Sequence, residues 1–383
     1  MFDEVRLDDV EALERLDTTD TLRALAMAGA HVRQSINLTE EAGLERFRDL
    51  KPRGVVVAAE GGSAAVADIF EAVSRTGSAL PVQVCSSGPL PGWVGTYDLV
   101  IAVSLSGRAA GTLALAAEAA RRGASLLTVG AAGSPLADVS EQARGVHVPM
   151  AVRGISSRTS VWGQVTPVLL AADAMGLAAA PRSTLESVAD ALDARATEVG
   201  PSAEAVVNPA KILATEVAES IPIVLGTGPF GAVAARRAAA MFGRTGRVPV
   251  AAGALPDAAS EIVACFDGPL AGGETKGHDR DADIFADPFV DGPSTPPLRL
   301  VLLSDGGAHG EDPMPVTDVV VAAAEDAGVR VSLIEGHGTT PLARLASHVA
   351  VTDFAATYLA LGHGFDPRDS PHVRLLRQAR GRS

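Results

Sequence analysis

The stretch DLVIAVSLSGRAAGTLALAAEAARRG, residues 98–123, joins an apolar run to an alanine-rich amphipathic segment. This pattern predicts a buried strand followed by a helix that ends at Gly123. Ser104, Ser106 and Gly107 stand where the strand turns into the helix. Ligands of a parallel sheet bind at this end of the strands, and the N–H groups that open a helix attract anions. We therefore expect the two serines to bind an anionic group, with the glycine allowing close approach of the backbone.

A second turn of the same kind lies earlier in the chain. In VVVAAEGGSAAVAD, residues 55–68, the apolar run ends at Glu60, and Gly61, Gly62 and Ser63 open the next helix. Helix capping would explain one such turn, because serine is a good capping residue. Two such turns on neighbouring strands would share one pocket, so the pair favours a phosphate-binding site.

Strands and helices alternate along most of the chain. This order predicts a doubly wound α/β fold with parallel sheets that are covered on both faces. We expect an N-terminal domain at 1–180, a linking helix at 181–200 and a C-terminal domain at 201–383. Within the last of these, residues 267–297 are rich in Gly, Pro and Asp. Because they show no apolar period, they are predicted to form a mobile loop.

Charge and hydropathy exclude several classes of partner. The 383 residues carry a net charge of -14, which leaves no basic surface for nucleic acid. No apolar run reaches the roughly 18 residues that a membrane span requires, and MFDEVRLDDV at the start is not a signal sequence. We expect a cytoplasmic protein.

Cysteine and histidine usage gives no sign of a metal centre. Cys85 and Cys265 have apolar neighbours in sequence and are expected to be buried thiols rather than a disulfide or a metal pair. His337 and His363 lack the spacing of metal ligands. We expect no metal site.

Four segments carry a resemblance to a known family. EGGSAAVAD (60–68) and SLSGRAAGTLALAAEAARRGA (104–124) resemble the two phosphate-binding turns of the SIS (sugar isomerase) domain. Together with RRAAAMFGRTGRVPVAAGALPDAASEIV (236–263) and TDFAATYLALGHGFDP (352–367), they resemble the double-SIS bifunctional phosphoglucose/phosphomannose isomerases, in a divergent actinobacterial-type branch. The resemblance implies an α/β protein with two doubly wound parallel-sheet SIS domains. It also implies a homodimer that binds a phosphorylated sugar and needs no cofactor.

Carried over position by position, the resemblance assigns the sugar phosphate to Gly61, Gly62, Ser63, Ser104 and Ser106. The family's second turn reads Ser-x-Ser-Gly-Asn-Thr, whereas this chain has SLSGRA at the same place.

The second turn of this chain therefore has different side chains from the family's turn. The threonine hydroxyl is missing at Ala109, and Arg108, beside Gly107, supplies a cation that would compensate by charge. Arg158, in RGISSRTSVW, matches the family's arginine after the last strand of the first domain. Its guanidinium would stabilise an enediolate.

The positions that carry the family's proton transfer are substituted. The resemblance places the family's glutamate at Arg244, its histidine at Ala259 or Ser260, and its C-terminal lysine at Arg377. Arginine stays protonated and does not act as a base at working pH. Two hypotheses remain: a sugar-phosphate-binding protein without turnover, or an active glucose/mannose 6-phosphate isomerase whose base has moved, with Glu261 as the candidate.

A dinucleotide-binding enzyme is the third and least favoured hypothesis. IPIVLGTGPFGAVAARRA, residues 221–238, contains Gly226, Gly228 and Gly231 in the spacing of a dinucleotide fingerprint. Such a fingerprint needs an acidic residue about 20 positions later, and none stands there.

Overall fold

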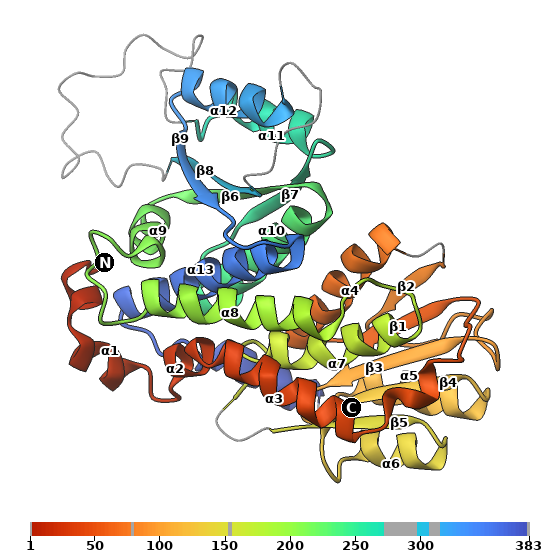
Figure 1. Cartoon of the computed structure of the whole chain (residues 1–383). Helices are drawn as coiled ribbons and strands as arrows, with labels where there is room; N and C mark the ends of the chain where they lie inside the picture. The colour runs from red at the N-terminus through yellow and green to blue at the C-terminus, as the bar shows by residue number, and fades with distance from the viewer. Residues whose placement is uncertain (1, 78–79, 152–154, 272–296, 306–314, 381–383) are drawn as a thin grey trace, which may run out of the picture. The chain divides into compact units, whose positions relative to one another are not determined.

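The computed structural model describes residues 2–77, 80–151, 155–271, 297–305 and 315–380 (Figure 1). Contacts between Cα atoms divide the chain into two compact units. Unit 1 comprises Met1–Thr18, Pro201–His337 and Val351–Ser383, and unit 2 comprises Thr19–Gly200 and Gly338–Ala350. Each unit is an α/β structure with one parallel sheet, as the sequence predicts.

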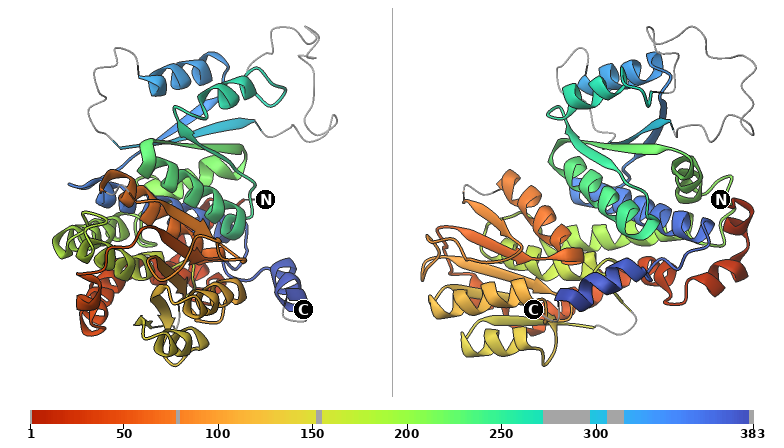
Figure 2. Two further views of the ribbon diagram at one scale, coloured as in Figure 1. Left: turned by 90° about the vertical axis from the view of Figure 1, so that its right-hand side faces the viewer. Right: turned by 180° about the vertical axis from the view of Figure 1, so that it is seen from behind.

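Unit 2 contains a five-stranded sheet and the helices that cover it (Figure 2). The strand order is β2-β1-β3-β4-β5, and every neighbouring pair is parallel. Its elements are α2 (Thr21–Ala26), α3 (Ala28–Glu41), η2 (Leu44–Phe47), β1 (Val55–Ala59), η3 (Gly61–Ser63), α4 (Ala64–Gly77), β2 (Val82–Cys85), β3 (Leu99–Ser104), α5 (Ala110–Arg121), β4 (Ser125–Ala131), α6 (Pro135–Gln142), β5 (Val146–Met150), α7 (Val161–Ala174) and α8 (Arg182–Glu198).

The core of unit 2 lies on both faces of this sheet. Every residue of β1 and β3 is buried, which explains why these strands are continuous apolar runs. Val56 and Val100 pack in one cluster with Leu115 of α5 and Leu136 of α6. The opposite face is covered by α4 and α7, which contact each other (Figure 1). Burial of each large aliphatic side chain stabilises this arrangement by about 1.5–3 kcal/mol.

Unit 1 contains a four-stranded parallel sheet of order β7-β6-β8-β9. Helices α11 and α12 cover one face, and α10 packs with α13 on the other (Figure 1). Its elements are η1 (Val5–Asp8), α1 (Val10–Leu16), α9 (Pro209–Ala218), β6 (Ile221–Thr227), α10 (Gly228–Met241), η4 (Phe242–Gly246), β7 (Ala251–Leu255), α11 (Ala259–Cys265), β8 (Leu298–Ser304), α12 (Val316–Asp326), β9 (Arg330–Glu335), the part of α13 (Pro341–Gly362) from Val351 onward, and α14 (Pro371–Arg380).

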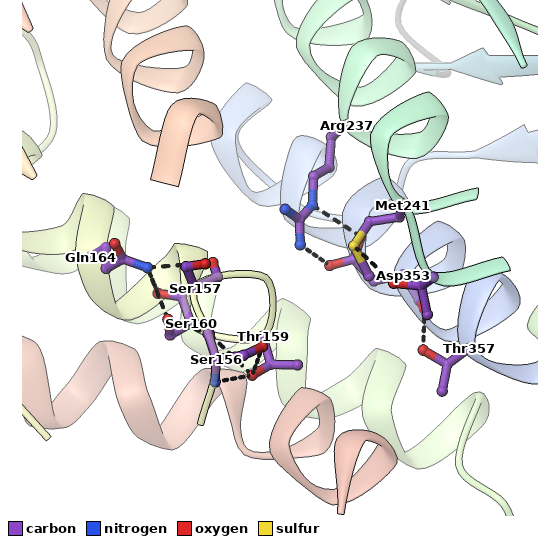
Figure 3. Close-up of polar contacts among 10 residues, drawn as sticks. Ser156, Ser157, Thr159, Ser160, Gln164, Arg237, Met241, Asp353 and Thr357 are labelled. Carbon is purple, nitrogen blue, oxygen red and sulfur yellow. Dashed lines mark hydrogen bonds and ion pairs between the residues drawn. The ribbon is translucent and has the colours of Figure 1, made fainter. Parts of the chain in front are cut away.

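A buried ion pair joins two helices of unit 1. Arg237 of α10 donates from Nε and Nη2 to the two carboxylate oxygens of Asp353 in α13, at 3.1 and 2.7 Å (Figure 3). Both side chains are buried. Removal of either partner would leave the other charge buried without this ion pair, which is strongly destabilising.

The two units differ from the domain limits expected from the sequence at 1–180, 181–200 and 201–383. The first 18 residues belong to unit 1, where the Arg6 guanidinium donates to the carbonyl oxygens of Leu361 and Gly362 at 3.2 and 2.7 Å. Helix α8, expected as a link, belongs to unit 2 and contacts α3 there. Most of the loop predicted at 267–297 lies outside the described residues.

Two other expectations concern the membrane and the cysteines. No described helix combines the length and the apolar character needed to cross a lipid bilayer. Cys85 and Cys265 are both free thiols. Cys85 is only half-buried and Cys265 is exposed, so the expectation of two buried thiols was wrong. Cys265 ends a short helix that turns this side chain away from the core, which its apolar neighbours in sequence did not reveal.

Candidate functional site

The two glycine-serine turns of unit 2 lie side by side. Strands β1 and β3 are hydrogen-bonded neighbours, and Ala59 pairs with Val103, so both strands end at the same level. The turn after β1 consists of Gly61–Ser63, and the turn after β3 consists of 105–109. The condition for a shared pocket, that the strands are neighbours, is therefore met.

The β3–α5 turn is held by its own backbone and by Ser104. The Gly107 N–H donates to the Ser104 carbonyl oxygen at 2.8 Å, and Gly107 has a φ of +63°. The buried Ser104 Oγ accepts from the Ala109 N–H at 3.3 Å. Ser106 and Arg108 are exposed, and Ser106 Oγ accepts from the Arg108 N–H at 3.3 Å. The turn thus presents one hydroxyl and one guanidinium to solvent.

Helix α5 begins without a capping side chain. Ala109 is its N-cap residue and offers no oxygen to the first turn. Within the described residues, the N–H groups of Ala110, Gly111 and Thr112 donate to no acceptor. The Thr112 hydroxyl is fully buried and, among those same residues, has no hydrogen-bond partner. Three unpaired N–H groups at the positive end of a helix make a site for an anion.

The β1–α4 turn is fastened to α7 through Gln164. The Ser63 hydroxyl is buried and donates to Gln164 Oε1 at 2.7 Å. Gln164 Nε2 donates in turn to Ser160 Oγ at 2.8 Å and to the Ser157 carbonyl oxygen at 3.4 Å (Figure 3). The hydrogen of the Ser63 hydroxyl is therefore already donated within the protein, and only the lone pairs of the hydroxyl oxygen are available to a ligand. Gly61 has a φ of +61°.

Arg158 lies in a turn that packs against this first turn. The turn is closed by the Thr159 N–H, which donates to the Ser156 carbonyl oxygen at 3.0 Å (Figure 3). A Cβ atom on Gly62 would lie 2.4 Å from Ser157 Oγ, so only glycine lets the two turns meet. Arg158, the next residue, is half-buried. Its predicted role beside the sugar remains a prediction, and its backbone lies beside the Gly62 turn.

A third turn, which the sequence analysis did not place in the site, supports the second. It joins β4 to α6, where buried Ser134 caps α6 by accepting from the Ala137 N–H at 3.4 Å. The Leu136 N–H donates to the Gly107 carbonyl oxygen at 3.2 Å. The signal was present, because Gly133, Ser134 and a proline follow a strand in the pattern of a helix start.

The remaining candidates belong to unit 1. Glu261 is exposed in the first turn of α11, and Ala259 and Ser260 precede it in the same helix. Arg244 is half-buried in the π-helical turn η4, and Arg377 lies in α14. The structure does not bring Glu261 together with the phosphate-binding turns in one unit, so its role as a base remains a prediction.

The glycines of the dinucleotide-like segment have a packing role. Gly226 in β6 and Gly231 in α10 approach so closely that a Cβ atom on Gly226 would lie 2.0 Å from the Gly231 carbonyl oxygen. Gly228 between them has a φ of +64°. Close packing of the strand against the helix therefore explains the spacing of these glycines without a cofactor.

Among the described residues, no cluster of His, Cys, Asp or Glu could hold a metal ion.

Comparison with known proteins finds a matching domain family for the C-terminal part of the chain. Residues 206–379 match the family model of the bacterial phospho-glucose isomerase C-terminal SIS domain. This chain carries a SIS domain of the phosphoglucose isomerase type. The predicted resemblance is confirmed at that level, and the bifunctional activity and the actinobacterial-type branch remain predictions.

Solved structures extend the similarity of fold to nearly the whole length of the chain. A hypothetical protein of Thermus thermophilus is 14% identical, with a TM-score of 0.65 and coverage of 97% of this chain and 94% of that one. The C-terminal domain of glucosamine-fructose-6-phosphate aminotransferase from Francisella tularensis is 11% identical, with a TM-score of 0.61 and coverage of 92% and 98%. A glucose-6-phosphate isomerase-like protein of Thermus thermophilus is 20% identical, with a TM-score of 0.52 and coverage of 89% and 97%. At these identities the similarity shows the fold alone. No curated protein matches the chain.

A pair of glycine variants tests the architecture of the β3–α5 turn. A Cβ atom on Gly107 would lie 2.0 Å from Ser134 Oγ, whereas one on Gly133, with a φ of +61°, would meet nothing within 4 Å. We expect Gly133→Ala to lower the free energy of unfolding by about 1–2 kcal/mol through the left-handed backbone alone. Gly107→Ala should lower it by about 2–5 kcal/mol, because overpacking against Ser134 is added. Urea unfolding of both variants measures the difference, and equal losses would contradict the packing of the two turns.

Proposed function

We propose that this protein binds a phosphorylated sugar at the β1 and β3 turns of unit 2. The observation that carries the proposal is the uncapped start of α5, with three N–H groups that have no acceptor among the described residues. It lies beside Ser106 and Arg108, both exposed. A phosphate dianion would accept from those N–H groups and from the Ser104 and Ser106 hydroxyls, and it would pair with the guanidinium.

The resemblance to SIS proteins supplies the sugar. In the family, the turns that correspond to Gly61–Ser63 and 104–109 hold a sugar phosphate, and Ser104, Gly107 and Gly62 fix the shape of both turns here. Ser63, bonded to Gln164, would position the first turn and accept from a sugar hydroxyl. Arg158 would lie over the sugar from the turn that packs on Gly62.

The residues that would bind the sugar phosphate differ from those that would catalyse its isomerisation. The family's base and ring-opening positions are Arg244 and Ala259 or Ser260, and none of these supplies a base. Glu261, the candidate substitute, is exposed on α11. We therefore infer that the protein binds sugar phosphates without isomerising them, in a sensory or regulatory role. We also expect it to be a cytoplasmic homodimer.

Calorimetry on the full chain tests the proposed function. We expect fructose 6-phosphate, glucose 6-phosphate or mannose 6-phosphate to bind, and free fructose to bind far more weakly, because the phosphate contacts dominate. Inorganic phosphate separates the anion from the sugar and should bind more weakly than the phosphorylated sugar. Equal affinity for free and phosphorylated fructose would contradict a phosphate site.

A further inference from the structure

Glu60 places a carboxylate beside the proposed phosphate site. It directly follows β1, and its side chain is half-buried. Its Oε2 atom lies 3.2 Å from the point that a Cβ atom on Gly111 would occupy, in the first turn of α5. Within the part of the chain that the structure describes, no cation pairs with Glu60.

The backbone is arranged to let this carboxylate approach. A Cβ atom on Gly111 would also lie 2.4 Å from the Ser86 carbonyl oxygen and 3.4 Å from the Ser87 Cα atom. Only glycine at position 111 allows Glu60 and the segment after β2 to reach the start of α5 together. The carboxylate and a carbonyl oxygen thus gather as acceptors next to the N–H groups that would hold the phosphate.

The Glu60 carboxylate and the Ser86 carbonyl oxygen together favour a ligand that carries a positive group. A dianionic ligand at the start of α5 would be repelled by the Glu60 carboxylate, and Arg108 is the cation that the turn itself supplies. A positive group on the ligand would turn this repulsion into a charge-assisted hydrogen bond. A neutral hydroxyl would donate a hydrogen bond there without offsetting the charge.

We propose that Glu60 makes the site selective for amino-sugar phosphates, whose ammonium group it would bind. This inference rests on the proposed function, because it concerns the same site. The phosphate would lie on the α5 N–H groups, and the ammonium group would donate to Glu60 and to the Ser86 carbonyl oxygen. Glu60 is here a specificity-determining residue and not a catalytic one.

Calorimetry with a matched pair of ligands tests the selectivity. Glucosamine 6-phosphate and glucose 6-phosphate differ only in the group on C2, and EDTA in the buffer removes bridging metal ions. We expect the unchanged protein to prefer glucosamine 6-phosphate by about tenfold to a hundredfold, the range of a charge-assisted hydrogen bond. N-acetylglucosamine 6-phosphate, which lacks the positive charge, should lose that preference.

Variants assign the preference to one side chain. Glu60→Gln should remove it, by weakening glucosamine 6-phosphate and leaving glucose 6-phosphate as tight or tighter. The matched control is Glu141→Gln, an exposed carboxylate near the far end of α6, which should keep the preference. Equal affinities in the unchanged protein, or a preference that survives Glu60→Gln, would overturn the inference while the proposed function stands. Failure of every sugar phosphate to bind would overturn the proposed function itself.

Discussion

Replacement of Ser104 and Ser106 together by alanine should lower the affinity for a sugar phosphate by more than a hundredfold. A hydrogen bond to a charged group contributes roughly 1.5–3 kcal/mol, and two are lost. At about 1.4 kcal/mol per factor of ten, their sum exceeds a factor of a hundred. Ser104→Ala also removes the oxygen that accepts from the Ala109 N–H, so the turn that aims the α5 N–H groups is loosened.

Calorimetry with fructose 6-phosphate measures this loss. Ser183→Ala, an exposed serine on α8, is the matched control and should bind as the unchanged protein does. Thermal unfolding of the double variant confirms that it is folded. An unchanged affinity in the folded double variant would place the phosphate elsewhere.

Isomerase activity on glucose 6-phosphate, mannose 6-phosphate and fructose 6-phosphate should be lower than that of an ordinary enzyme by roughly 10²–10⁴-fold. That factor is the usual contribution of a positioned base. A guanidinium at Arg244 stays protonated and does not remove the C2 proton. Ala259 and Ser260 supply no imidazole to open the ring.

A coupled assay on purified protein measures the turnover. An ordinary enzyme turns over at about 10 s⁻¹. Turnover at that rate, abolished by Glu261→Gln, would contradict the binding hypothesis and identify Glu261 as the relocated base. Turnover that survives Glu261→Gln would show that another residue is the base.

The sequence predicts well the strands, the helix and the turns that form the site, for a physical reason. Buried parallel strands are continuous apolar runs, and serine and glycine mark the points where they turn into helices. The predicted strand and helix at 98–123 became β3 and α5, and the strand before Gly61 became β1. A shared pocket requires β1 and β3 to be neighbouring strands, and the sequence does not show whether they are. The strand order of the sheet shows that they are neighbours.

Long-range contacts were not visible in the sequence. Gln164 bonds Ser63 across 101 residues, and no local pattern marks a glutamine as the anchor of a distant turn. The edge strand β5 gives only a weak strand signal in the sequence, because His147 and Pro149 alternate with its buried residues. Glu60 was taken as the end of a strand, since its closeness to Gly111 depends on the pairing of β1 with β3.

The position of the phosphate is tested by a map of backbone amide chemical shifts during titration with fructose 6-phosphate. On deuterated protein, we expect the largest changes at Gly107, Arg108 and Gly111, with smaller changes at Gly61 and Gly62. This result would locate the phosphate at the uncapped start of α5 and the sugar beside the first turn. Changes confined to unit 1, for example around Gly226 and Gly231, would contradict a phosphate site at the start of α5.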